Sequence, residues 1–459
     1  MSKQAAQNTT NQITEGVIWK QLLIFFFPIL FGTFFQQLYN TADAIIVGNF
    51  VGKEALASVG GSASTIINLL VGFFVGLSSG ATVIISQYYG ADNRRRVSDS
   101  VHTAIALAIA GGVVIMLIGL VSARFALTAM GTPDDILSLS LTYMKIYYLG
   151  TIPSMIYNMG SGILRAVGDS KRPLYFLIAS CLVNIVLDLL FVAVLDMGVA
   201  GAAIATIASQ FFSAILTLIA LLRTQDSYRL IVSKIRFHRD LLFDIIKIGL
   251  PAGLQSAMYS ISNLLIQSSI NSFGSTVVAG SSASANLEGF VYTAMNAFSQ
   301  AAVTFTSQNM GARKYQNLNR VVLNCLLCAI VTGVVLGGGA VLAGTQLLHF
   351  YSSDAAVIAA GYERLRVICG TYLLCGIMDT LASSLRGLGY SVLPMVVSLV
   401  GSCLLRLVWI ATIFQLNRTP FMLYISYPIS WVLTAAVHLA CLLVVRHKMR
   451  QRGQTLQAA

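Results

Sequence analysis

The feature that most constrains the fold is a series of long apolar runs between residues 17 and 445. A helix needs about 20 mostly apolar residues to cross the hydrocarbon core of a bilayer, whereas the strands of a membrane β-barrel are about ten residues long and alternate. The runs therefore predict an all-α membrane protein with twelve transmembrane helices. The predicted spans are 17–48, 55–86, 99–121, 138–164, 173–195, 198–222, 242–272, 277–308, 319–344, 356–385, 393–415 and 420–445.

The composition agrees with a membrane protein, because charged residues make up only 10% of the 459 residues and hydrophobic residues make up 56%. A soluble domain carries about 25% charged residues. The net charge of +12 is therefore not a sign of nucleic-acid binding. In a membrane protein its meaning depends on which loops hold the positive charges. We expect the lipid bilayer as a partner and no nucleic acid.

Two motifs recur along the chain at one spacing. Residues 86–91 (SQYYGA) return as 307–312 (SQNMGA), and 164–173 (LRAVGDSKRP) return as 385–394 (LRGLGYSVLP), both 221 residues later. An even number of spans in each repeat gives both copies the same orientation, so we predict two six-helix lobes related by a pseudo-two-fold axis along the membrane normal, with the substrate path between them. The predicted division is a tail at 1–16, an N-lobe at 17–222, a linker at 223–241, a C-lobe at 242–445 and a tail at 446–459.

The orientation follows from the lysines and arginines, of which the chain has 29. Most of them fall in the loops that share one side with the N-terminus, and cytoplasmic loops carry such an excess. The prediction is a multi-pass protein of the cell membrane with both termini and the 223–241 linker in the cytoplasm.

Most of the 17 acidic residues lie in or near loops, and those clearly within predicted spans are Asp43, Asp188, Glu288 and Asp379. A carboxylate at the centre of a bilayer costs at least roughly 2.5–3.5 kcal/mol, so such residues are candidates for function. Asp379 is seven residues before Arg386, and we expect a local ion pair or a role at the helix end there.

Asp43 and Asp188 lie at the same depth, roughly 8–14 Å below the outer ends of their helices. Asn184, one turn before Asp188, and Thr206 in the next span reach this layer. Two carboxylates in a low dielectric repel each other, so at least one must hold a proton or both must share a cation. The layer predicts a coupling-ion site for H⁺, or for Na⁺ held by Asp43 and Asp188. The alternative is that each side chain bonds a neighbouring helix and only stabilises packing.

The substrate cavity is expected beside this layer, because Gln36, Tyr39 and Asn40 give the first span a polar outer half. Glu288 lies near mid-membrane in the second half, and the equivalent place in the first half has Ile67 and Asn68 but no carboxylate. Glu288 and Asn68 are included among the cavity residues. Glu288 could neutralise a cationic substrate or bind the ion, or it could pair with Ser and Asn neighbours in its own half.

Signatures of an enzyme are absent from the sequence. No P-loop is found, and the five histidines are scattered singly without metal-ligand spacing. We expect neither catalytic residues nor an organic cofactor. A membrane-embedded enzyme or a receptor would need a clustered catalytic set or a sizeable soluble domain.

The chain resembles the MATE family (multidrug and toxic compound extrusion) from about residue 17 to residue 445. The resemblance is carried by the paired LR-containing motifs and by two segments, 183–188 (VNIVLD) and 198–206 (GVAGAAIAT). It implies an N-lobe ion site made of an Asp in the first helix, an Asn and an Asp four apart in the fifth and a Thr in the sixth. The residues at these places are Asp43, Asn184, Asp188 and Thr206.

The second lobe departs from the pattern of some relatives. Its first helix has Gln255 and Tyr259 but no carboxylate near them, and Cys375 is found one turn before Asp379. A cation site in the C-lobe is therefore not expected.

The function expected from the sequence is a monomeric secondary active antiporter. It would export amphipathic, cationic drugs or metabolites in exchange for H⁺ or Na⁺. The alternative is a lipid-linked precursor flippase of the same superfamily, which would need a cationic cavity for phosphate.

Overall fold

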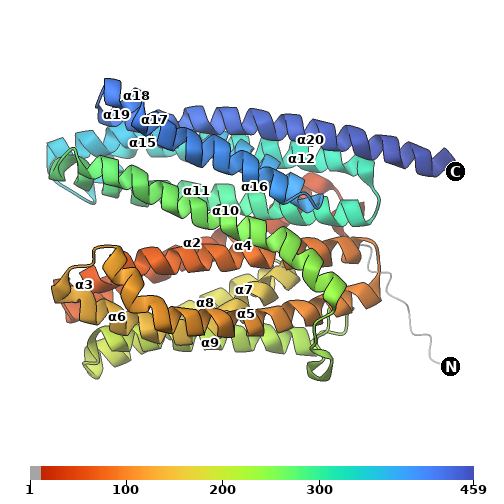
Figure 1. Cartoon of the computed structure of the whole chain (residues 1–459), viewed down its shortest axis with the longest axis horizontal. Helices are drawn as coiled ribbons and strands as arrows, with labels where there is room; N and C mark the ends of the chain where they lie inside the picture. Colours follow the sequence, from red (N-terminus) through yellow and green to blue (C-terminus); the bar gives the residue numbers. More distant parts are fainter. Residues whose placement is uncertain (1–11, 459) are drawn as a thin grey trace.

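The protein is described from a computed structural model, which is entirely helical over the described residues, 12–458. The side chain of Asn40, those of a few neighbours up to Gly60 and those of residues 450–458 lie outside what the structure describes. In Figure 1 the first-half helices, red to yellow, lie mainly below, and the second-half helices, green to blue, lie mainly above. The predicted all-α membrane fold is confirmed.

The helices of the first half are α1 (Gln12–Glu15), α2 (Ile18–Phe50), α3 (Lys53–Gly60), α4 (Ser62–Gly90), α5 (Arg94–Ala129), α6 (Asp134–Leu149), α7 (Thr151–Ala166), α8 (Lys171–Asp188), the π-helix η1 (Leu189–Val194) and α9 (Gly198–Arg223). A short 3₁₀ turn, η2 (Val232–Lys234), follows. Those of the second half are α10 (Arg239–Asn271), α11 (Ser275–Gly311), α12 (Tyr315–Thr332), η3 (Gly333–Gly337), α13 (Gly338–Leu342), α14 (Gly344–His349), α15 (Ala355–Gly387), α16 (Val392–Ser398), η4 (Leu399–Leu404), α17 (Leu405–Ala411), α18 (Ile413–Leu416), α19 (Pro420–Tyr424) and α20 (Ser426–Ala458).

Ten helical stretches of the described chain are long and apolar enough to cross a membrane. Two further passes bring the number to the predicted twelve. One is α11, which has 37 residues but many polar side chains. The other is the span predicted at 138–164, which is interrupted at Gly150 into two 16-residue helices. Pro153 has no N–H for the carbonyl of Leu149, and this explains the break.

Helices α4 and α10 join the two halves through a seam of glycines. Gly76 and Gly80 of α4 face Gly253 and Gly249 of α10, so each helix presents glycines four residues apart. A Cβ atom added to Gly76 would lie 2.4 Å from the Cα of Gly253, and one added to Gly80 would lie 2.6 Å from the nitrogen of Gly249. Small residues at this spacing let membrane helices touch along their backbones. The α4–α10 contact therefore depends on these glycines.

The repeat-related contact, between α2 and α11, is built from aromatic rings instead. Phe26 stacks on Phe298 with ring centroids 3.9 Å apart, and Phe34 lies 5.7 Å from Phe290. The two sides of the interface between the halves are thus chemically different although the helices are related by the repeat.

A backbone oxygen of the first half is bound from both halves where α4 crosses α11. The carbonyl of Ala166 accepts a hydrogen bond from Ser86 of its own half, at 3.0 Å, and another from Gln308 of the other half, at 2.6 Å. The helices approach so closely here that a Cβ added to Gly90 would lie 2.1 Å from the carbonyl oxygen of Gln308.

The second half repeats this arrangement 221 residues later. The carbonyl of Gly387 accepts a hydrogen bond from Ser307 of its own half and one from Gln87 of the other half, both at 3.1 Å. The recurring motifs of the sequence thus meet at the same end of the molecule. We name the two cross-half hydrogen bonds, from Gln87 and Gln308, the glutamine latch.

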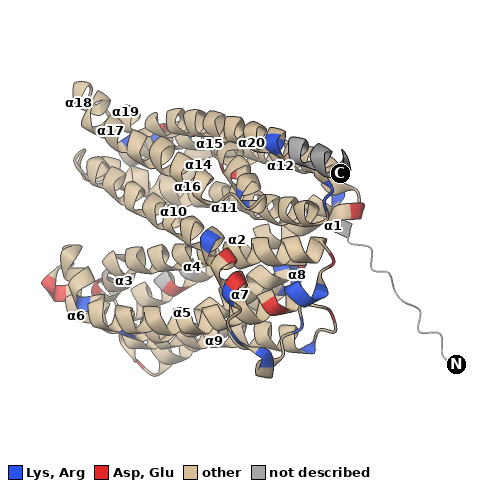
Figure 2. Cartoon of the chain, turned by 45° about the vertical axis from the view of Figure 1, so that its right-hand side comes forward, with Lys and Arg blue, Asp and Glu red and all other residues tan. Residues whose placement is uncertain are grey.

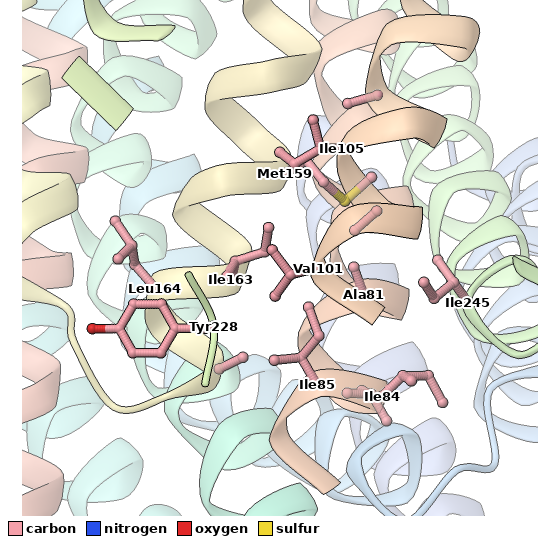
Figure 3. Packing of buried hydrophobic residues seen from close by; sticks show 14 of the residues in the cluster. Ala81, Ile84, Ile85, Val101, Ile105, Met159, Ile163, Leu164, Tyr228 and Ile245 are labelled. Atoms are coloured by element: carbon pink, nitrogen blue, oxygen red, sulfur yellow. The ribbon is translucent and has the colours of Figure 1, made fainter. Parts of the chain in front are cut away.

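The linker between the halves is docked on the first half. Tyr228 and Leu230 are buried in a core shared by α4, α5 and α7, where Figure 3 shows Ile85, Val101 and Ile163 packed together. The backbone nitrogen of Ile231 donates to His102 at 2.9 Å. Figure 2 shows most lysines and arginines at the end of the molecule that holds the C-terminus and this linker.

Candidate functional site

A cavity with a volume of about 480 Å³ lies mainly within the first half. Helices α2, α4, α6, α7, α8 and α9 supply its walls, and Asn296 and Gln300 of α11 reach it from the second half. Pockets of roughly 300–1,000 Å³ hold drug-sized ligands. We name this space the central cavity.

Four polar residues from three helices meet at the edge of the central cavity. Asp43 of α2 has its carboxyl group within hydrogen-bonding reach of Asp188 of α8 and of the hydroxyl of Thr206 of α9. Asp43 and Thr206 line the cavity, whereas Asn184 and Asp188 are fully buried behind them. The structure thus brings together all four residues of the predicted coupling-ion layer.

Asn184 connects the two carboxyl groups. Its side-chain amide lies 3.0 Å from Asp188 Oδ2 and 2.9 Å from Asp43 Oδ1, and with its nitrogen toward them it donates a hydrogen bond to each. With its oxygen toward them, three oxygens would face one another, an arrangement that suits a bound cation. The amide can therefore serve either state of the site.

One oxygen of this cluster has no partner. Among the described residues, no donor reaches Asp188 Oδ1, although the atom is buried. A buried carboxylate oxygen without a partner is costly, and a proton or a cation would remove that cost. The donor set of two carboxylates, an amide and a hydroxyl fits either H⁺ or Na⁺, since hard cations prefer oxygen ligands.

The backbone changes form directly after Asp188. Helix α8 ends at this residue and η1 continues the chain as a π-helix, in which the nitrogen of Leu195 donates to the oxygen of Leu190 at 2.9 Å. Single π-helical turns are rare and occur frequently at functional sites. Asp188 thus lies where the α-helix changes into a π-helix.

Three of the residues predicted for the substrate cavity line the central cavity: Gln36, Tyr39 and Asn68. The side chain of Asn40 lies outside the described residues. Tyr39 also lies within hydrogen-bonding reach of Thr206, so it connects the cavity wall with the carboxylate cluster.

Glu288 is not among the residues that line the central cavity. Its carboxylate accepts two hydrogen bonds from Arg364 of α15, at 2.7 and 2.9 Å, and one from Ser284 at 3.0 Å. Arg364 also donates to Ser281. Its position in the sequence places it near the outer side of the membrane, but its side chain is buried. Of the roles open to Glu288, the geometry favours pairing within its own half, with Arg364 as the main partner.

A second, smaller cavity of about 140 Å³ lies between the halves and is called here the inner cavity. Asp379, Arg386 and Arg165 line it, and Arg165 lines the central cavity as well. Asp379 and Arg386 interact electrostatically, but no described carboxylate lies within 4.0 Å of either arginine. The local ion pair expected between Asp379 and Arg386 is therefore not a direct contact.

Several residues that line the central cavity are not predicted from the sequence. Tyr143 and Tyr147 of α6 line the central cavity, and Gln210 donates to the hydroxyl of Tyr147 at 3.4 Å. The spacing of the two tyrosines, one helical turn, is a signal that they share a face. Arg165 is indistinguishable in the sequence from the other positive charges near the inner loops.

Long apolar helices around a cavity that holds a carboxylate are the architecture of a multi-pass membrane transporter. A family model described as MatE matches the chain twice, over residues 28–190 and 251–412, so the chain belongs to the MatE family of multidrug efflux transporters. The two matches fall one in each half of the chain.

Curated relatives agree with this assignment. The probable multidrug resistance protein YpnP of Bacillus subtilis is 28% identical over 396 residues, which cover 86% of this chain and 88% of that protein. YoeA, of the same description and organism, is 26% identical and covers 85% and 86% of the two chains. The multidrug export protein MepA of Staphylococcus aureus is 22% identical, covering 82% and 83%.

Solved structures share the fold. A multidrug resistance MATE transporter in an outward-facing conformation matches with a TM-score of 0.89 at 22% identity, covering 96% of this chain and 99% of that one. A transporter of the MOP superfamily from Pyrococcus furiosus matches with the same values.

Proposed function

We propose that the protein is a secondary antiporter that exports amphipathic cationic drugs or metabolites in exchange for H⁺ or Na⁺. The observation that supports this most is the buried Asp188, whose Oδ1 has no described partner and whose carboxyl group lies within hydrogen-bonding reach of Asp43 at the edge of the central cavity. An ion that binds there removes the repulsion between the carboxyl groups, and its release restores it. The same cluster therefore has two charge states.

Exchange follows from the position of Asp43. Because its carboxyl group faces both the cavity and Asp188, a cationic substrate in the cavity and the coupling ion compete for the same negative charge. Entry of the ion from outside neutralises the cluster and weakens the hold on the substrate. Substrate entry from the cytoplasm is favoured once the ion has left.

Movement between the two states would require the halves to separate at the inner end. The glutamine latch closes that end, whereas the α4–α10 glycine seam holds the halves together along its length. We infer that alternating access breaks the latch while the seam persists. Such rocking of one repeat against the other around a central site is the general mode of two-repeat transporters.

The orientation is part of the proposal. Since lysines and arginines gather at the end that holds the latch and the linker, we place this end and both termini in the cytoplasm. The protein is proposed to work as a monomer in the cell membrane, because each chain encloses a complete cavity and a complete carboxylate cluster.

The flippase alternative would need a cationic cavity for phosphate. Asp43 lines the central cavity on the side of the carboxylate cluster, which favours cationic cargo there.

The proposal is tested with the purified full chain in proteoliposomes. Transport of the cationic dye ethidium is measured under an imposed proton gradient and, separately, under an imposed sodium gradient. One of the two ion gradients is expected to drive accumulation of the dye against the concentration gradient of the dye. If neither gradient drives transport while the reconstituted protein remains folded, ion-coupled antiport is excluded.

A further inference from the structure

Arg165 is a cation without a counter-charge at the inner end of the central cavity. It belongs to the last turn of α7 and lines both cavities. Among the described residues, no carboxylate lies within 4.0 Å of its guanidinium, and no hydrogen bond from it is found. The carbonyl end of α7 offsets only part of this charge. A partly buried, unpaired guanidinium is costly unless something binds to it.

The repeat-related arginine of the second half has a hydrogen-bond partner that Arg165 lacks. The counterpart of Arg165 is Arg386, 221 residues later, which donates to Gln255 at 3.0 Å and interacts with Asp379 on the same helix. The residue that corresponds to Asp379 in the first half is Asn158. The second half thus places a carboxylate near its arginine, whereas the first half has a neutral amide.

Asn158 does not replace the missing acceptor. Its side-chain nitrogen donates to the backbone oxygen of Ser154 at 2.8 Å, and its side chain lines the central cavity. The inner cavity holds two arginines and one carboxylate, Asp379, among its lining residues. The remaining polar side chains that line it are hydroxyls and amides, which can donate to an anion. The formal charge of this space is positive.

We propose that Arg165 is an anion-binding subsite that holds a carboxylate or phosphate group of an amphipathic ligand in the central cavity. A guanidinium binds either group with two parallel hydrogen bonds. The inference rests on the proposed function and makes its substrate class more specific. The cargo then includes zwitterions that carry an acidic group beside the basic one.

The position of the subsite keeps opposite charges apart. Asp188 is 17 residues beyond Lys171, which follows α7 at the inner end, so the carboxylates lie roughly 25 Å farther toward the outer side. An acidic group at Arg165 therefore does not meet Asp43 or Asp188. The central cavity thus has a positive end and a negative end.

The test uses two dyes that differ by one charge. Tetramethylrhodamine has a free carboxylate, and its methyl ester is a cation of nearly the same shape. Binding of each to the purified full chain is measured by fluorescence anisotropy. Arg165→Gln is expected to weaken binding of the acid at least tenfold and to change binding of the ester less than twofold.

Asn158→Asp tests the same idea without removing the arginine. It gives the first half the carboxylate that the second half has, so it should neutralise Arg165 and weaken binding of the acid as Arg165→Gln does. Asn158→Gln is the matched control and should keep the preference of wild type for the acid. If Arg165→Gln and Asn158→Asp bind both dyes as wild type does, or lose both equally, the subsite is refuted.

Repetition in nanodiscs identifies the source of the anion. If either phosphatidylglycerol or phosphatidylcholine competes with the acid in wild type and no longer does so in Arg165→Gln, the group at Arg165 is a lipid phosphate. If neither lipid competes, it belongs to the cargo. Transport of the ester under an ion gradient is scored separately, so that failure of antiport and failure of the subsite are distinguishable.

Discussion

Gln87 in the first half donates a hydrogen bond to the carbonyl of Gly387 in the second half, 3.1 Å away. The repeat supplies the counterpart from Gln308 to Ala166. Gln87→Leu combined with Gln308→Leu should remove both bonds, worth about 1 kcal/mol each. The inward-open population is then expected to rise about 30-fold.

This prediction is checked by electron–electron distance measurements between spin labels at Arg95 and Tyr315, in a background without native cysteines. The double variant should add a longer distance. Ser86→Ala removes a bond within one half only and should not. An unchanged distribution in the double variant would show that the latch does not hold the inner end closed.

The glycine seam predicts a position-dependent effect on stability. Gly80→Ala would place a Cβ atom 2.2 Å from the carbonyl of Ile245 and should destabilise the protein by about 1–3 kcal/mol. Gly72→Ala, on the same helix, would meet Ser256 at an ordinary 3.5 Å and serves as the control. Thermal unfolding in detergent measures both, and equal melting temperatures would contradict the seam.

The Glu288–Arg364 pair is predicted to stabilise the second half rather than to bind cargo. Glu288→Ala leaves a buried guanidinium unpaired and should cost about 3–5 kcal/mol. Glu288→Leu combined with Arg364→Met should recover much of this loss. Thermal unfolding provides the measurement, and ethidium transport per folded molecule should be retained in the double variant. Loss of transport in a stable double variant would show that Glu288 and Arg364 contribute to the substrate path.

Asn184 should be required for the carboxylate cluster although it has no charge. Asn184→Leu removes the amide that contacts both Asp43 and Asp188, and gradient-driven ethidium transport should fall at least tenfold. Leu182→Asn, on the exposed face of the same helix, is the control and should transport as wild type does. Transport by Asn184→Leu at the wild-type rate would show that the amide is dispensable.

Much of the scaffold could be predicted from the sequence, because the apolar runs and the two recurring motifs depend on local composition. Counting residues from the outer loops also grouped Asp43, Asn184, Asp188 and Thr206, since depth along a helix follows from its rise. The role of this group as an ion site stays a prediction.

The features that the sequence could not show depend on how each helix is rotated about its own axis and on contacts between residues far apart in the sequence. The pairing of Glu288 with Arg364 joins residues 76 apart, and it depends on which faces α11 and α15 present to each other. The isolation of Arg165 could be recognised only after its neighbours were placed. The interruption at Gly150 was hidden because the apolar run continues through it.

The central claim is that Asp188 binds the coupling ion, and Asp188→Asn in proteoliposomes tests it most directly. The amide keeps the shape of the side chain but can neither carry the charge nor take up the proton. Gradient-driven ethidium accumulation should fall at least tenfold, while Asp240→Asn, on the exposed inner surface, should transport as wild type does. Accumulation by Asp188→Asn at the wild-type rate and with the wild-type gradient dependence would contradict the account.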